Sequence, residues 1–239
     1  MSYTRETIEY KECTINIVSD DDPENPRNRD NASEMYCWHR RYNLGDLRNQ
    51  KPISKDYSNP EDLIYELAGI DKDEYWEEHE KEPTVAELYD AIEKKGHLVA
   101  MLYLYDHSGI SISSSPWTGR AQHAEWDSGP VGYQVMRKET IDEEWQGDTT
   151  KAWKYMEGEV ETYDQYLTGD IWGYRIEGAE EDSCYGYYGD DGIKDAIQEA
   201  KSHIDWYYKE KTIKHLQKLK DWIRNKVPIQ YRQPLQIAV

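Results

Sequence analysis

The stretch HLVAMLYLYD, residues 97–106, constrains the fold more than any other part of the sequence. It is an almost uninterrupted apolar run, which is typical of a strand buried on both faces in the interior of a sheet. Directly before it, TVAELYDAIEKKG (84–96) has the pattern of a helix, because Thr84 and Glu87 have capping-box spacing and Gly96 follows two lysines. A helix followed at once by a central strand places both kinds of element in one fold.

The other patterns predict strands and helices in an irregular order. Apolar alternation predicts strands over residues 8–18, 35–42, 109–113 and 131–138, and a hairpin over 171–178 and 183–189. Helical spacing predicts helices over residues 58–69, 71–80, 151–170 and about 193–223. Since regular β-α-β alternation is missing, the expected class is α+β, with a mixed or mainly antiparallel sheet, flanking helices and a helical C-terminus. We expect residues 1–190 to form one core domain and residues 191–239 a helical extension that packs on it or mediates dimerisation.

The chain is strongly acidic, with 48 acidic and 29 basic residues and a formal net charge of −19. Residues 61–94 hold 13 acidic and 3 basic residues, and residues 139–164 hold 9 and 2, whereas residues 194–226 hold 9 basic and 5 acidic residues. Such a surface repels nucleic acids and anionic membranes and attracts basic proteins, although solubility alone also explains it. The acidic interaction surface is expected at Asp71, Asp73, Glu74, Glu77, Glu78, Glu80 and Glu82.

Cysteine usage and the N-terminal sequence indicate a cytoplasmic protein. The three cysteines, Cys13, Cys37 and Cys184, form no CxxC motif, which is typical of free thiols in a reducing compartment. MSYTRETIEYKEC lacks the apolar segment of a signal peptide, and no window approaches 18 consecutive apolar residues. We therefore expect neither secretion nor membrane binding.

Two similar turns are the main candidate for a binding site. YDHSG (105–109) and WDSG (126–129) each place Asp, Ser and Gly beside strand-like sequence. If the strands at 97–106 and 131–138 pair, both turns lie at one end of the sheet. The alternative is two ordinary turns, in which Asp and Ser cap backbone donors and Gly109 takes a positive φ. The residues expected to bind a ligand or partner are Asp106, His107, Ser108, Trp126, Asp127, Ser128, Tyr133, His39 and Arg41.

Catalytic and metal-binding interpretations of these residues stay open as alternatives. Ser108 or Ser128 with His107 and Asp127 supplies the residue types of a hydrolytic triad, but without a G-x-S-x-G elbow. The weak metal candidates are Cys37, His39, His107 and Cys184, and Asp106 with Asp127 would suit a harder ion. Arg40 and Arg41 among aromatic rings could stack a base and pair a phosphate, although no P-loop or G-x-G-x-x-G motif is present. We expect no cofactor, and binding rather than catalysis.

Several strings resemble an uncharacterised family of accessory proteins from bacteriophages and from integrative or conjugative elements. These are PR-x-x-DN-x-x-x-MYCWHRRYNLGD (26–46), LYLYDHSG (102–109), WDSGPVGY (126–133) and GEVETYDQYLTGDIWGY…DSCYGYYG (158–189). The chain departs from that family at Arg29, where the family has Trp, and by lacking a Cys within 113–126. The missing Cys weakens the metal interpretation.

The resemblance implies a setting in the host-cell cytoplasm rather than a reaction. Small acidic proteins of mobile elements often block host defences by mimicking DNA, by plugging a nuclease or its sensor, or by sequestering a nucleotide signal. Our hypothesis is therefore a non-catalytic inhibitor that acts through its acidic surface on a basic host defence protein, which could itself bind nucleic acid. The alternatives are a nucleotide sponge that uses the aromatic region of the two turns, and a metal-dependent nucleotide hydrolase. A homodimer is possible in each case.

Overall fold

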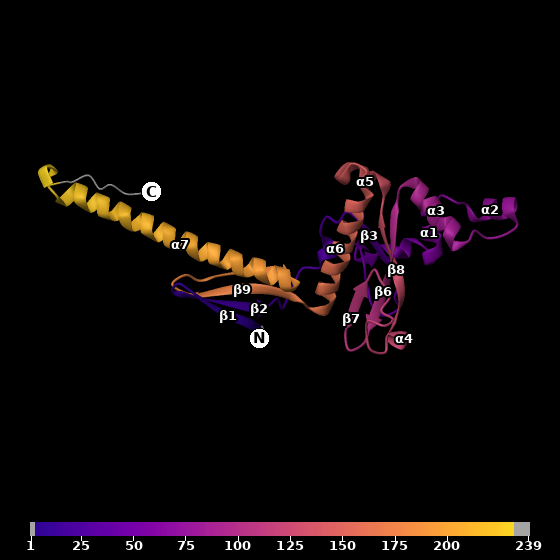
Figure 1. Ribbon diagram of the computed structural model, residues 1–239, viewed down its shortest axis with the longest axis horizontal. Helices are drawn as coiled ribbons and strands as arrows, with labels where there is room; N and C mark the ends of the chain where they lie inside the picture. Colours follow the sequence, from indigo (N-terminus) through magenta and orange to yellow (C-terminus); the bar gives the residue numbers. More distant parts are fainter. Residues whose placement is uncertain (1–2, 232–239) are drawn as a thin grey trace. The chain divides into compact units, whose positions relative to one another are not determined.

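The structure is a computed structural model that describes residues 3–231, and these residues divide into two compact units (Figure 1). Unit 1 combines the chain up to Asp21 with the chain from Ile171 onward, and unit 2 spans Asp22–Asp170. This division differs from the expected core domain of residues 1–190. The reason is that the strand over Cys13–Ser19 pairs with the strand over Ile171–Gly178, so both ends of the chain build the same unit.

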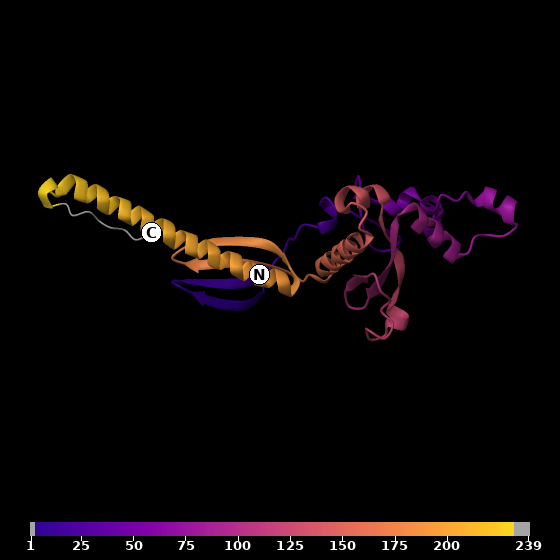
Figure 2. The same cartoon turned by 45° about the horizontal axis from the view of Figure 1, so that its top comes forward.

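Unit 1 is an antiparallel sheet covered on one face by a long helix (Figure 2). The strand order is β1 (Thr4–Tyr10), β2 (Cys13–Ser19), β9 (Ile171–Gly178) and β10 (Asp182–Tyr188). Helix α7 (Gly189–Lys226) packs Ile193, Ala196, Ala200 and Ile204 against the inward residues of β2 and β9. The sequence pattern predicts a single strand over residues 8–18, but Lys11 has a φ of 56° and starts the turn that separates β1 from β2.

Helix α7 covers its sheet with only its first half. The last buried residue of the helix is Ile204. Tyr207 and Tyr208, one turn further on, are partly exposed, and Lys209 is exposed. From Lys209 to Lys226 no residue is buried. The predicted C-terminal helix is therefore confirmed and packs on the sheet of its own unit as far as residue 204. The final residues of the expected extension, 232–239, lie outside the described part of the chain.

Unit 2 is built on a second antiparallel sheet with helices on both faces. The strand order is β3 (Glu34–Cys37), β8 (Ser128–Met136), β6 (Leu98–Asp106) and β7 (Ile110–Ser113). Helix α6 (Thr149–Thr168) packs Val160 and Tyr163 on one face. Helices α1 (Pro60–Ala68) and α3 (Val85–Lys95) pack on the other face, around Val135. The shorter elements are η1 (Pro26–Asn28), β4 (Leu47–Arg48), β5 (Lys51–Pro52), η2 (Ile53–Asp56), α2 (Lys72–His79), α4 (Ala124–Asp127), α5 (Lys138–Trp145) and, in unit 1, η3 (Ile229–Tyr231).

The α+β class with antiparallel sheets is confirmed, and so are most of the predicted elements. Strand β6 lies between β8 and β7, as its apolar run predicts, and Thr84 and Glu87 form the capping box at the start of α3. The predicted strand over 35–42 is too long, since β3 ends at Cys37 and the chain then turns around His39. Among residues 3–231, no helix combines the length and the apolar character that crossing a membrane requires.

Candidate site at the two turns

The two Asp-Ser-Gly turns lie together at one end of the unit 2 sheet, because the two strands named as a condition in the sequence analysis do pair. Strands β6 and β8 pair in antiparallel register, with Tyr105 opposite Ser128. This register places the turn after β6 beside the short helix α4 that precedes β8. The two turns are joined by a hydrogen bond between Nδ1 of His107 and Oδ2 of Asp127, which lie 2.8 Å apart. We call Arg41, Asp106, His107, Trp126 and Asp127 the two-turn site.

A third segment, the loop after β3, completes this site. The guanidinium of Arg41 donates a hydrogen bond to Asp106, and the hydroxyl of Tyr42 donates a second one at 3.4 Å. His39 holds the loop in place, because its Nδ1 accepts the backbone N–H groups of Arg41 and Tyr42 at 3.3 and 3.2 Å, and its ring stacks on Tyr42. Burial, aided by the charge of Arg41, lowers the pKa of His39, so the neutral imidazole that this geometry needs is the favoured form.

Four residues of the two-turn site line a hollow of about 380 Å³, namely Arg41, Asp106, Trp126 and Asp127. Its lining combines the cationic side chains of Arg40 and Arg41 with the carboxylates of Asp106 and Asp127. Trp126 lines it too and is 86% exposed, which is unusual for so large an apolar ring. A hollow with both charge signs and an uncovered indole can hold a polar ligand by hydrogen bonds and stack a planar ring.

Three aromatic residues beside the site were not anticipated from the sequence. Tyr105 stacks on His107 with ring centroids 5.8 Å apart and contacts Trp117 at 5.5 Å, while His123 lies 6.0 Å from His107. The hydroxyl of Tyr105 donates to the carbonyl of Gln122, which ties the 117–123 loop to the sheet. For Trp117 and His123 the signal was the aromatic content of SSSPWTGRAQHAEW, and Tyr105 stood in YDHSG, but neither string carries register information.

Other expected site residues serve the fold instead. Tyr133 lies mid-strand opposite Tyr36 and Met101 and packs with the α1 and α3 cluster, so its assignment to the site is corrected. The hydroxyl of Ser128 donates to the carbonyl of Ala124 at 2.6 Å rather than to His107. Ser108, not Gly109, takes the positive φ of the turn, at 60°.

The weak metal candidates do not form a ligand set. Cys37 is buried under α6, and burial raises the pKa of its thiol to about 12. Cys184 belongs to unit 1, whereas His39 and His107 belong to unit 2. Within residues 3–231, no group of three or more His, Cys, Asp and Glu side chains is arranged to hold a metal ion.

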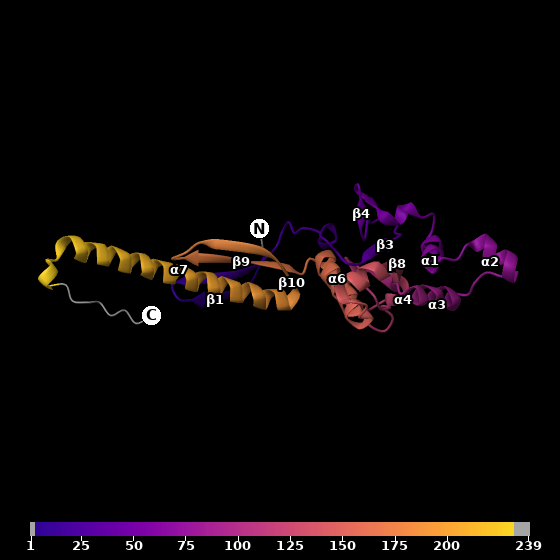
Figure 3. The same cartoon turned by 90° about the horizontal axis from the view of Figure 1, so that it is seen from above.

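The expected acidic surface lies on helix α2 and its two flanking loops (Figure 3). Asp71 caps the helix by accepting the N–H groups of Asp73 and Glu74 at 2.9 and 3.1 Å. Glu82, beyond the helix, pairs with Lys72 at 3.6 Å. None of the α2 side chains is buried, and Trp76 is 55% exposed. The remaining acidic residues of this surface, Glu77, Glu78 and Glu80, are exposed as well.

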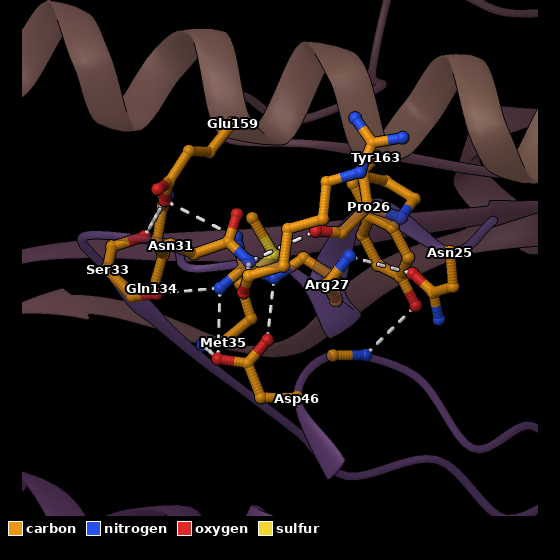
Figure 4. A network of polar contacts seen from close by, with 12 residues as sticks. Asn25, Pro26, Arg27, Asn31, Ser33, Met35, Asp46, Gln134, Glu159 and Tyr163 are labelled. Carbon is orange, nitrogen blue, oxygen red and sulfur yellow. Dashed lines mark hydrogen bonds and ion pairs between the residues drawn. The ribbon is translucent and has the colours of Figure 1, made fainter. Parts of the chain in front are cut away.

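A buried polar network explains several motif residues (Figure 4). Arg27, whose side chain is 1% exposed, donates to Asp46 at 2.6 and 2.9 Å, to Glu159 at 3.3 Å and to the carbonyl of Ser33 at 2.6 Å. Burial opposes the charge of the guanidinium, but the hydrogen bonds and charges of Asp46 and Glu159 outweigh it, so the pKa of Arg27 is raised. Gln134 joins the network by donating to Ser33 at 2.7 Å. These motif residues therefore attach the 25–46 segment to α6 and the sheet.

Comparison of the chain with protein-family models, with curated proteins and with solved structures finds no match.

Proposed function

We propose that the chain is a non-catalytic binding protein that captures a basic partner protein through helix α2. The observation that carries this proposal is the exposure of α2, which buries none of its eight residues although it begins and ends with defined caps. A helix this short is not stable in isolation, so its caps and flanking loops hold it in place. Because no α2 residue is buried, the core of unit 2 does not depend on the carboxylates of this helix.

The chemistry of α2 suits an electrostatic contact. Glu74, Glu77 and Glu78 present negative charge, and the indole of Trp76 is exposed on another face of the same helix. Tryptophan is enriched among the residues that dominate binding energy at protein interfaces, and surrounding charges accelerate association with an oppositely charged surface. The partner would therefore be basic, as nucleic-acid-binding proteins are.

The biological setting of the proposal comes from the motif resemblance alone. If the chain is an accessory protein of a phage or other mobile element, a basic host defence protein in the cytoplasm is the expected target. The acidic surface would then occupy the site that DNA normally takes, or would block a nuclease or its sensor. A DNA-mimicking complex weakens steeply as salt rises from about 50 to 200 mM.

A second candidate function is binding of a small nucleotide at the two-turn site. The specific observation that favours it is the uncovered Trp126 beside a hollow that Arg40 and Arg41 line. A hydrolase is less well supported, because the Ser128 hydroxyl donates to the carbonyl of Ala124 rather than to His107.

The test is affinity capture from a bacterial lysate with three forms of the chain. The wild type is compared with the triple charge reversal Glu74→Lys, Glu77→Lys, Glu78→Lys, which changes only exposed side chains of α2. The matched control reverses three exposed charges of unit 1, Glu6→Lys, Glu177→Lys and Glu181→Lys, for the same change in net charge.

We expect a protein that the wild type and the control retain, that the α2 variant loses, and that duplex DNA displaces. Loss of the same protein from both variants would assign the contact to net charge rather than to α2. Retention by the α2 variant would overturn the proposal. The double substitution Asp106→Ala, Asp127→Ala should leave capture unchanged, and it would abolish a hydrolytic activity of the two-turn site.

A further inference from the structure

Unit 2 contains a second cavity, away from both surfaces discussed above and independent of the proposed function. It measures about 640 Å³ and lies between the segment around η1 and the helices α5 and α6. This volume falls within the range of small-molecule sites in proteins. Several of its lining residues, including Pro26, Asn31 and Glu159, belong to the strings that carry the motif resemblance.

The walls of this cavity are fixed before any ligand arrives. The side-chain amide of Asn31 donates to the carbonyls of Pro26 and Arg29 at 3.1 and 2.8 Å, which closes the loop after η1. Beneath it, Glu159 is 7% exposed and is held by the backbone N–H of Ala32 at 2.8 Å and by Arg27. A preorganised site loses less entropy on binding than a mobile one.

Gly158 is an exposed glycine of α6 that leaves open space at the cavity wall. It lies inside the α6 helix, where glycine is less stable than alanine. A Cβ built at this position meets no atom within 4 Å, and φ is not in the left-handed region, so neither packing nor backbone conformation requires glycine. The residue lines the cavity, and its lack of a side chain leaves room for a ligand against the helix.

The lining chemistry selects the kind of ligand. Trp145 and Tyr155 meet at the cavity with ring centroids 5.2 Å apart, and Tyr155 is 46% exposed, so a ring surface is available for stacking. Lys154 and Arg29 place cationic groups at the same cavity, and Asp30 adds a carboxylate. Aromatic rings bind planar bases, cations bind phosphate, and a carboxylate accepts hydrogen bonds from ribose hydroxyls.

We propose that this cavity binds a nucleoside phosphate. The base stacks on the ring surface of Tyr155 and Trp145, the phosphate pairs with Lys154 and Arg29, and Asp30 accepts the sugar hydroxyls. Gly158 lets the ligand approach the α6 helix. The surrounding helices are acidic and repel an anionic ligand, so the contacts to base, sugar and phosphate are all needed for binding. Inorganic phosphate or a free nucleoside should therefore bind more weakly than the complete nucleotide.

The test is isothermal titration calorimetry of the full chain with ATP, GTP, CTP and UTP, with adenosine and inorganic phosphate as partial probes. We expect at least one nucleotide to bind with a dissociation constant below about 1 mM and both partial probes to bind at least about tenfold more weakly. Gly158→Leu places a branched side chain at the cavity wall, where a Cβ meets no protein atom within 4 Å, and should weaken binding by about tenfold or more, as should Tyr155→Ala.

Two controls distinguish binding in this cavity from misfolding of the variants and from binding at the two-turn site. Gly158→Ala adds one methyl group and should cost much less affinity than Gly158→Leu. Thermal unfolding of both variants checks that they fold. The double substitution Asp106→Ala, Asp127→Ala should not change the affinity, because the two-turn site does not take part. Absence of binding by all four nucleotides at about 1 mM, or binding that Gly158→Leu leaves intact, would overturn the proposal. Neither result depends on whether α2 captures a protein.

Discussion

Arg27 and Asp46 face each other through two hydrogen bonds, from Nε to Oδ1 at 2.6 Å and from Nη2 to Oδ2 at 2.9 Å. The same aspartate accepts the backbone N–H of Met35 at 3.1 Å, so it connects η1 to the start of the sheet. Two-point contact between a guanidinium and a carboxylate is strong and directional. The pair therefore defines the path of the segment that leads from η1 into β3.

Removing Arg27 should destabilise unit 2 strongly. Arg27→Met leaves the carboxylates of Asp46 and Glu159 without their cation, and breaking a buried ion pair in this way costs about 3–5 kcal/mol. Urea unfolding followed by circular dichroism measures the change. As a control, Arg48→Met breaks the exposed pair with Asp56 and should cost less than about 1 kcal/mol. Equal losses in the two variants would show that the buried network contributes no special stability.

The contacts within this network could not be predicted from the sequence. Arg27, Asp46 and Glu159 were each visible within conspicuous strings, but their contacts span 19 and 132 residues of the chain. Local patterns carry no information about such distant pairs. The motif strings suggested a binding site, whereas most of their polar residues hold the fold together. A large buried arginine partnered by two carboxylates cannot be recognised without the structure.

Replacing Ser108 should stabilise the turn after β6. Its φ of 60° is in the left-handed region, which costs a residue with a Cβ about 1 kcal/mol and costs glycine little. Ser108→Gly should therefore raise the free energy of unfolding by roughly 0.5–1 kcal/mol. Ser114→Gly is the control, because the φ of Ser114 is not positive and glycine there should be neutral or destabilising. A loss of stability in Ser108→Gly would mean that the serine side chain holds the turn.

Acid should loosen the loop around His39. The folded state lowers the pKa of this histidine, so its contribution to stability is present above the ordinary value of about 6.5 and is lost as pH falls toward the lowered pKa. Protonated Nδ1 can no longer accept the N–H groups of Arg41 and Tyr42. In His39→Asn the side-chain carbonyl can still accept at low pH. We expect the wild type to lose more stability than this variant between about pH 7 and 5, and parallel pH profiles would contradict the assignment.

The three thiols should differ in reactivity. Cys13 and Cys37 are buried, and burial raises the pKa of Cys37 to about 12, so very little thiolate forms there at neutral pH. Cys184 is partly exposed. Iodoacetamide at pH 8, read by peptide mass spectrometry, should modify Cys184 first and Cys37 only after unfolding in urea. Early modification of Cys37 would show that α6 opens from the sheet in the native state.

Sequence patterns predicted elements better than they predicted domains and site membership. The α3 capping box and the β9–β10 hairpin depend on neighbouring residues and were predicted correctly. The pairing of β6 with β8 entered the sequence analysis only as a condition, and the structure meets it, with His107 and Asp127 at one end of the sheet. In contrast, the pairing of β2 with β9 joins segments from the two ends of the chain, and no local sequence pattern predicts it. Tyr133 was misplaced because a two-residue strand period leaves the choice of face open.

The central claim is that α2, and not the two-turn site, carries partner binding. Biolayer interferometry with the captured partner immobilised tests it most directly, using the α2 charge reversal and the Asp106→Ala, Asp127→Ala double variant side by side. We expect the α2 variant to lose at least about tenfold in affinity, mostly through slower association, and the double variant to bind as the wild type does. An α2 variant that binds normally, together with a double variant that does not, would contradict the account and move the function to the two turns.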